Sequence, residues 1–585
     1  MKDLMILWHS LSGRNYSRTA NVNPDNSDDT GDQDESKTQP QIKNFRRKSP
    51  VMVNRFLNGA VPVNAGYREK WSRNVFMLMT LGLLGLASGC FVLLCRPYEL
   101  LFKWKITFGE GGEIFEAWRN PEVDLYVKIY LFNVTNHDEY LQGRDSKLRF
   151  QETGPYVYKE LLEHTDIVFN DNGTLTAVPL HPLQYMPELS NGSEQDILIL
   201  PNIALLSIAN VMKDASYVTR WGLNMLIRQT DSHPLVRMTA HEFMFGYKST
   251  LVTLGYHIMP SWIKFDKLGL IDRMYDFDGD YETIYTGETD IRMTGLIEKY
   301  NGDVNLPQWT GKCANVHGAS DGTKFQGFIQ PNDTLLFFRK SLCRSARMVR
   351  VGEKTVKSLY SYHYTFMENE LDNGAVNPEN KCFCRQGTCL KSGLIDVTDC
   401  YYGFPIALSY PHFYKADPSI LASLEGLEPK KELHESYFFI EPTSGLPTSL
   451  ASRFQINMVL QNIEHIARVE KLANFVLPLL WFEIGMYGLP DSLNTRFLLY
   501  LNVLPTMEIV MMYLLFFSGV MFLIWSIVKI LSHQEKRSSI YWLEKKMAIR
   551  ARTQNDRQAD LKSREMDTCS SPLVSNDSNP MPIIV

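Results

Sequence analysis

The sequence lacks the short motifs by which many hydrolases and nucleotide-binding enzymes are recognised. Neither a G-x-S-x-G nucleophile elbow nor a phosphate-binding loop occurs in its 585 residues. His241-Glu242 begins like the zinc-protease motif H-E-x-x-H, but Phe245 occupies the position of the second histidine. The acidic run at 276–280 places its glycine at the wrong position for a calcium loop. We therefore predict a protein that is not an enzyme and that has no metal site and no cofactor.

Charge is missing from two long apolar runs, Val75 to Leu94 and Ile509 to Val528. Each run holds about 20 residues, and a helix of that length crosses the hydrocarbon layer of roughly 30 Å. The alternative is a pair of buried helices in a soluble protein, but core helices rarely avoid polar residues so completely. The sequence therefore predicts two transmembrane helices.

A cleavable signal peptide is also missing, because a long polar stretch precedes the first run. Lys and Arg gather before the first run and after the second, so both tails are expected in the cytosol. The composition of the N-terminal tail predicts disorder over most of its length, and the last forty residues resemble it. The predicted parts are a cytosolic tail (1–72), a transmembrane helix (73–96), an ectodomain (97–507), a second transmembrane helix (508–529) and a cytosolic tail (530–585).

The predicted ectodomain has an excess of negative charge. It holds 37 Lys and Arg against 49 Asp and Glu, whereas the tails are basic. An acidic domain argues against nucleic acid as a partner, and basic tails suit the anionic inner leaflet of a bilayer.

Cysteine is scarce, with nine residues in the chain, and six of them lie in the ectodomain between Cys313 and Cys400. An even number in an oxidising compartment favours three disulfides, although fifteen pairings are possible. A zinc site is the alternative for Cys382, Cys384 and Cys389, but their C-x-C-x4-C spacing lacks suitable histidines. We also expect N-linked glycans on the N-x-S/T acceptors Asn133, Asn172, Asn191 and Asn332.

Alternating apolar residues predict short strands in the ectodomain, separated by Gly, Pro and Asn turns. The strands are expected at 125–132, 154–159, 174–178, 335–339 and 437–441. Helical spacing predicts a cluster of helices at 201–245 and a further helix at Ile456 to Lys471. The predicted class is α+β, with a large antiparallel sheet or barrel and an inserted helical cluster.

Read in order, the ectodomain resembles the class B scavenger receptor family, which includes fatty-acid translocase, the lysosomal integral membrane protein and the insect sensory neuron membrane proteins. The resemblance runs from Arg68 to Lys529. It is carried by KIYLFNVTN (128–136), ETGPYVY (152–158), EFMFGY (242–247), TGETD (286–290), LCRS (342–345), NKCFC (380–384), PIALSYPHF (405–413) and IEPTSG (440–445).

The resemblance implies a barrel-like ectodomain crossed by a hydrophobic tunnel, with the helical cluster at its membrane-distal apex. It implies the disulfides Cys313–Cys382, Cys343–Cys400 and Cys384–Cys389. It also implies a receptor that binds lipids, lipoproteins or other hydrophobic ligands and passes lipid to the membrane. The expected ligand contacts at the apex are Ile203, Leu206, Leu223, Leu226, Ile227 and Arg228.

Three alternatives concern the partner and the location. The same helices could dock a protein cargo or an adhesion partner, and a two-span channel is a further possibility that the Met- and Phe-rich second run does not favour. Ile583-Ile584 resembles a dileucine sorting signal without its usual acidic residue. We therefore expect the plasma membrane, with the endosome or lysosome membrane as the alternative.

Overall fold

The computed structural model describes residues 73–253, 267–372, 374 and 376–567. Contacts divide the chain into two units, residues 1–76 and 77–585, and only the start of one helix is described in the first. The β-rich domain and the residues of both apolar runs from Met77 onward belong to the second unit.

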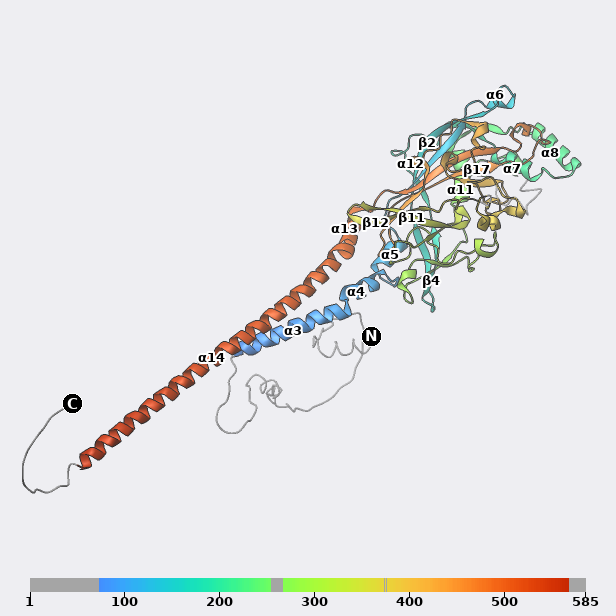
Figure 1. The fold of residues 1–585 in the computed structure, drawn as a ribbon. Helices are drawn as coiled ribbons and strands as arrows, with labels where there is room; N and C mark the ends of the chain where they lie inside the picture. The colour runs from blue at the N-terminus through green and yellow to red at the C-terminus, as the bar shows by residue number, and fades with distance from the viewer. Residues whose placement is uncertain (1–72, 254–266, 373, 375, 568–585) are drawn as a thin grey trace, which may run out of the picture. The chain divides into compact units, whose positions relative to one another are not determined.

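A sheet of 12 strands forms the centre of the ectodomain (Figure 1). Its strands are β1 (Leu125–Val134), β2 (Leu148–Glu160), β5 (Leu183–Tyr185), β10 (Leu335–Arg339), β11 (Arg344–Val356), β12 (Leu359–Phe366), β13 (Ile395–Asp396), β14 (Ile406–Ser409), β15 (Leu424–Glu425), β16 (Tyr437–Ile440), β17 (Pro447–Val459) and β18 (Val476–Met486). The main path runs β10-β11-β12-β16-β17-β18-β1-β2-β15. Every pair on this path is antiparallel except β2 with β15.

Two smaller sheets complete the strands. The first has the order β3 (Glu163–Phe169), β4 (Thr174–Leu180), β8 (Glu282–Tyr285), β9 (Ile297–Tyr300), and the second pairs β6 (Ile197–Pro201) with β7 (Leu235–Thr239). The long central strands β17 and β18 are buried at nearly every position, which is expected for strands covered on both faces.

The helices lie mostly before, between and after these strands. They are α3 (Arg73–Cys95), α4 (Pro97–Ile106), α5 (Glu113–Arg119), α6 (His137–Leu141), α7 (Ile203–Val211), α8 (Tyr217–Gln229), α9 (Ala240–Phe245), α11 (Leu270–Met274), α12 (Lys431–His434), α13 (Asp491–Leu498) and α14 (Leu504–Asp567), with a π-helical segment at Leu499–Val503. Two helical stretches, Arg73–Ile106 and Asp491–Lys562, are long and apolar enough to cross a membrane. They contain the two apolar runs that the sequence predicts as spans.

The five predicted strands are confirmed as β1, part of β2, β4, β10 and β16. The barrel-like form that the resemblance implies is not a closed barrel. Among the described residues the path of the main sheet ends at β10 and at β15, so the sheet stays open. In the part of the chain that the structure describes, an isolated bridge joins Ser320 to Phe337 at the β10 edge. The class is therefore mixed helix and sheet, with largely antiparallel sheets.

Three predicted segments differ from the structure. Residues 235–239, inside the predicted helical cluster, form strand β7 because Pro234 interrupts the helix and LVRMT then pairs with β6. The predicted helix from Ile456 is wrong: its first residues continue β17, where pairing with β18 overrides their helical spacing. The C-terminal residues 546–567, expected to be disordered, continue helix α14.

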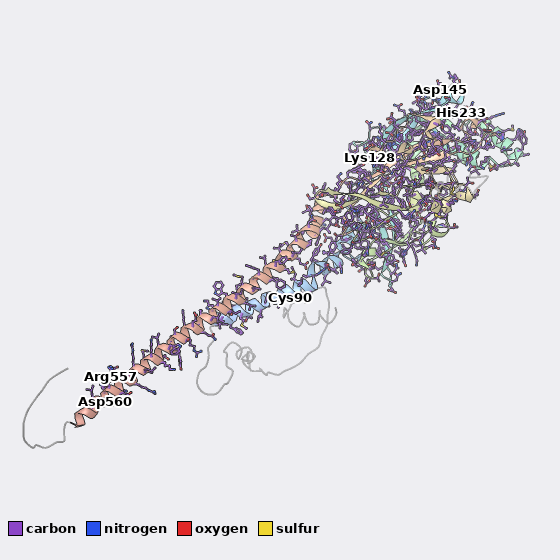
Figure 2. All side chains as sticks on the ribbon, in the orientation of Figure 1. Cys90, Lys128, Asp145, His233, Arg557 and Asp560 are labelled. Atoms are coloured by element: carbon purple, nitrogen blue, oxygen red, sulfur yellow. A yellow bond between two sulfur atoms is a disulfide. The ribbon has the colours of Figure 1, made fainter. Side chains whose placement is uncertain are left out.

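Beyond the apolar run, α14 continues as an exposed helix. Every described side chain from 531 to 562 is exposed, and Figure 2 marks this stretch with Arg557 and Asp560. The domain boundaries at 72, 96, 507 and 529 stay predictions about membrane placement, and the N-terminal tail lies outside the described residues.

Candidate functional site

A cavity of about 150 Å³, the inner cavity, lies within the ectodomain. Its apolar wall comes from α5, β10, β16, β17 and β18 and includes Ile114, Trp118, Phe337, Phe438, Leu450 and Ile484. Ile484 and Met486 are two positions apart on β18, so they face the same side of the sheet and both line this space. A mostly apolar cavity of this size can hold a small apolar molecule or part of a longer one.

A second cavity of about 190 Å³, the juxtamembrane cavity, lies beside the segments that join the sheet to the candidate spans. Phe102 and Ile106 of α4 line it on the side of the first span, and Phe497, Tyr500 and Leu501 line it before α14 begins. Lys105, Glu113 and Arg496 add charge to its wall. Lys105 Nζ lies 3.1 Å from Glu113 Oε2, and Arg496 Nη1 lies 3.8 Å from Glu113 Oε1.

The two cavities share part of their walls. Five side chains line both of them: Ile114, Ala117, Leu446, Leu493 and Phe497. All five are apolar, so no charged group stands between the two spaces along this shared wall. The inner cavity therefore adjoins a second space next to the residues that enter the candidate spans.

One buried charged cluster borders the inner cavity. Glu160 is completely buried; Arg339 Nη2 donates to its Oε1 (2.9 Å), the OH of Tyr275 donates to its Oε2 (3.0 Å), and His181 Nδ1 lies 2.6 Å from Oε1. Burial alone would raise the pKa of Glu160, but Arg339 and His181 outweigh it and hold that pKa at about 2. The carboxylate of Glu160 thus stays ionised and keeps Arg339 and His181 in place at the cavity wall.

Lys324 is a second buried cation on this wall. Its ammonium donates to the carbonyl oxygens of Thr294 (2.8 Å) and Phe325 (3.1 Å). Burial lowers the pKa of Lys324 to about 7, with Glu441 opposing that effect. An apolar cavity with a few fixed polar groups suits an amphiphilic ligand.

Helices α7 and α8 form the other candidate site. Each begins at a side-chain cap: Asn202 Oδ1 accepts from Leu205 N at α7, and Ser216 Oγ accepts from Thr219 N at α8. Figure 1 shows both helices at the end of the β-rich domain that lies away from α13. Apolar side chains remain exposed on one face of α8: Tyr217 (77%), Val218 (73%), Trp221 (55%) and Met225 (53%).

The predicted ligand contacts occupy different positions on these helices. Ile203, Leu206 and Ile227 are completely buried, and Leu223 and Leu226 are partly buried against the core. Arg228 is exposed near the end of α8. Asp231, which follows α8, pairs with Arg468 at 2.7 Å, and this arginine lowers the pKa of Asp231. The exposed face of α8 was missed because helical spacing identifies an apolar stripe without saying whether the domain covers it.

The disulfide pairs in the structure are Cys313–Cys382, Cys343–Cys400 and Cys384–Cys389, the same pairs that the resemblance implies. Among the described residues, Cys90 and Cys95 are free. Of the predicted glycan acceptors, Asn172, Asn191 and Asn332 are exposed, while Asn133 lies within β1 and its Oδ1 accepts a hydrogen bond from Ile199 N (2.9 Å).

These features define a membrane protein in which two candidate spans enclose one disulfide-bonded, β-rich domain with adjoining apolar cavities. The chain belongs to the CD36 family, whose model matches residues 76–530. Scavenger receptor class B member 1 of Rattus norvegicus is 30% identical over 479 residues, which cover 80% of this chain and 92% of the rat protein.

Two other relatives have different names. Lysosome membrane protein 2 of Mus musculus is 30% identical over 412 residues, covering 69% of this chain and 84% of the mouse protein. Protein peste of Drosophila melanogaster is 28% identical over 415 residues, covering 69% of this chain and 74% of the fly protein. The resemblance seen in the sequence is therefore confirmed at the level of the family.

Proposed function

We propose that this protein is a scavenger-type receptor that takes up lipid or the lipid of lipoproteins and passes it to the membrane through its ectodomain. The observation that carries the proposal is the wall of five apolar side chains shared by the inner and juxtamembrane cavities. The scavenger receptor class B relatives support the same class of function.

The energetic reason for a walled route is the poor solubility of long acyl chains. Transfer of one methylene from water to an apolar wall is worth about 0.8 kcal/mol, so an acyl chain gains with every group that stays inside. A route that ends at Phe102, Phe497 and Leu501, next to the spans, lets lipid reach the bilayer without crossing water. The shared wall contributes no charge that would oppose this passage.

The proposed capture surface is the exposed face of α8, formed by Tyr217, Val218, Trp221 and Met225. Four neighbouring apolar side chains on one face form an exposed patch of the kind that marks interaction sites. Arg228, exposed on the same helix, supplies a cation for the phosphate or carboxylate of a lipid. Ile203, Leu206 and Ile227 then act as the packed support of this surface, and Leu223 and Leu226 lie at its edge.

The direct test is the identity of what co-purifies with the full-length protein. Solvent extraction and mass spectrometry should find a fatty acid, sterol, carotenoid or other apolar lipid at near-stoichiometric amounts. A purified, folded protein that carries no lipid and binds none from added vesicles would contradict the proposal.

A second candidate function is docking of a protein cargo or adhesion partner on the same exposed face, which the aromatic residues Tyr217 and Trp221 favour because aromatic side chains are enriched at protein interfaces. Trp221→Asp should reduce capture of lipoprotein, with Leu433→Asp, at an exposed position of α12, as the matched control. If Trp221→Asp abolishes binding of a protein partner but leaves lipid capture unchanged, the docking function is the correct one.

A further inference from the structure

His164, Glu282 and Asp321 are side chains of the types that bind metal ions, and they lie close together. The family resemblance implies no metal at this place. His164 lies on β3, Glu282 on β8 and Asp321 in the loop that follows β9. One ligand atom from each lies within 4.8 Å of the other two. His164 and Glu282 are buried, while Asp321 is partly exposed.

The register of the small sheet explains why His164 and Glu282 meet although β4 runs between their strands. His164 is paired with Pro179, and Glu282 is paired with Ala177. Pro179 and Ala177 are two positions apart on β4, so they face the same side of the sheet. The short side chain of Ala177 leaves room for the two longer ones, and His164 Nε2 lies 3.4 Å from Glu282 Oε1.

The hydrogen bonding of His164 fixes which nitrogen can bind a cation. Its Nδ1 lies 3.0 Å from the carbonyl oxygen of Trp118, and its ring stacks on the Trp118 ring with centroids 3.8 Å apart. A carbonyl only accepts, so the hydrogen of the neutral ring is on Nδ1 and Nε2 carries a lone pair. This is the arrangement of histidine ligands, in which the second nitrogen donates to a backbone carbonyl.

The two facing atoms have no hydrogen-bond partner. His164 Nε2 and Glu282 Oε1 are both buried, and neither is satisfied by a donor. Two buried acceptors that face each other require a proton or a metal ion between them, because a buried polar atom without a partner is destabilising.

The distance between His164 Nε2 and Glu282 Oε1 matches two ligands of one zinc ion better than a hydrogen bond through a shared proton. With Zn–N and Zn–O bonds of about 2.0–2.1 Å, two ligands of a tetrahedral site lie roughly 3.3–3.4 Å apart. The distance of 3.4 Å from His164 Nε2 to Glu282 Oε1 falls in this range. Asp321 is oriented by its neighbour, because its Oδ1 accepts from Thr323 N (2.9 Å) and from Thr323 Oγ1 (2.6 Å).

The surrounding charges allow a cation here. Asp321 interacts electrostatically with Arg339, but Arg339 is already bound to Glu160 at 2.9 Å. The ammonium of Lys324 is turned to the carbonyl oxygens of Thr294 and Phe325. Two carboxylates therefore face one imidazole, a donor set of one nitrogen and two oxygens that suits Zn²⁺.

We propose that His164, Glu282 and Asp321 bind a divalent transition metal, with Zn²⁺ as the best fit, in the wall of the inner cavity. Glu282 and Asp321 both line that cavity, so a fourth coordination position is open to it. The metal ties β3, β8 and the loop at Asp321 together. This site does not depend on the proposed lipid transfer.

The test uses the full-length protein in detergent, purified without a polyhistidine tag, stripped with a chelator and reloaded with Zn²⁺. Elemental analysis should find about one zinc per chain, Co²⁺ should give a visible absorption band typical of a tetrahedral site, and Zn²⁺ should raise the melting temperature. His164→Gln and Asp321→Asn should each weaken zinc binding by at least about tenfold. If substitution of the buried His164 prevents folding, Asp321→Asn alone tests whether the cluster binds zinc.

The matched control is His241→Gln. His241 Nδ1 lies 3.2 Å from Glu194 Oε1, so it is also a histidine beside a glutamate, but it lies on the surface outside the three-residue cluster. Its substitution should leave zinc binding unchanged. Failure of the stripped wild type to bind zinc, or equal binding by Asp321→Asn and wild type, would overturn the proposal and leave a protonated Glu282 that donates to His164.

Discussion

Gly85 of α3 and Gly519 of α14 bring the backbones of the two candidate spans into direct contact. A Cβ atom on Gly85 would lie 3.1 Å from Gly519 Cα, and a Cβ on Gly519 would lie 2.9 Å from the backbone nitrogen of Leu86. Helices in a bilayer gain little from apolar burial against each other, so close packing at small residues is a main source of their association. The two glycines thus hold together the spans at the two ends of the ectodomain.

Gly519→Leu should force the two helices apart. Because the obstructing atoms belong to the backbone, the added side chain cannot be accommodated by a rotamer change, and we expect a loss of roughly 1–3 kcal/mol. The measurement is the unfolding free energy of the full-length protein in detergent, together with the distance between spin labels on the two helices. Val520→Leu, at an exposed neighbouring position, is the control; an unchanged label distance in Gly519→Leu would contradict the packing.

From the surroundings of His434 we predict that the folded protein loses stability as the pH falls from neutral to acidic values. Its Nδ1 accepts from Lys430 N (2.9 Å), and its ring stacks on His412 with centroids 4.4 Å apart. Burial, then the charge of His412, lowers the pKa of His434 from 6.5 to about 4, with Glu152 opposing and Arg453 adding to the effect. The unfolded chain therefore takes up a proton below pH 6.5 that the folded protein refuses.

The resulting stability is present above pH 6.5 and is lost as the pH falls toward 4, by on the order of 2 kcal/mol after solvent screening. His434→Gln keeps an acceptor for Lys430 N and should flatten this part of the pH profile. Denaturant unfolding of the full-length protein across this range measures the effect. The exposed His317→Gln should keep the wild-type slope; a wild-type slope in His434→Gln as well would refute the assignment.

Protonation of Glu160 should also lower the stability of the folded protein as the pH falls, but in a lower pH range than His434. Its pKa is about 2 in the folded protein against an ordinary value of 4.5, so its contribution is complete above pH 4.5 and is lost as the pH falls toward 2. Glu160→Gln leaves Arg339 buried without its charged partner, and we expect a loss of about 3–5 kcal/mol at neutral pH. Chemical denaturation at several pH values should also show a weaker acid dependence below pH 4.5 in this variant.

The control for Glu160 is Glu425→Gln. Glu425 also accepts from an arginine, Arg149, at 3.0 Å, but both side chains are exposed. Water and salt screen the attraction between two exposed charges, so this substitution should change the stability little. Equal losses of unfolding free energy in Glu160→Gln and Glu425→Gln would contradict a larger contribution from the buried cluster.

The disulfide between Cys313 and Cys382 closes a loop of 69 residues within the ectodomain. Replacing both cysteines by serine should lower the free energy of unfolding by about 2–5 kcal/mol, because the unfolded chain gains freedom. Thermal unfolding of the full-length protein measures the loss. Cys90→Ser removes a free cysteine and should leave the ectodomain transition in place; the opposite ranking of the two variants would contradict this pairing.

Much of the fold could be predicted because period-2 patterns and long apolar runs depend on local sequence. Leu125 to Phe132 alternates and forms β1, and the two uncharged runs form α3 and part of α14. The prediction failed where tertiary pairing decides. Residues from Ile456 have helical spacing, yet β18 supplies hydrogen-bond partners along β17, so the segment is extended.

The candidate site could be predicted only in outline. The family phrases indicate a lipid-related receptor, but the cavity walls combine α5, β10, β17 and β18, which are distant in sequence. His164, Glu282 and Asp321 have no recognisable spacing, since only the register across β4 brings the first two together. The exposed face of α8 could be recognised only in the structure, because Trp221 is exposed whereas Ile227 on the same helix is buried.

The most direct test of lipid passage is the rate at which the protein, reconstituted in vesicles, transfers a labelled fatty acid or sterol into the bilayer. Ala117 lines both cavities, so Ala117→Phe should fill their shared wall and reduce transfer several-fold, while Ala422→Phe, at an exposed position, should transfer like the wild type. Transfer by a correctly folded Ala117→Phe at the wild-type rate would contradict passage through the ectodomain.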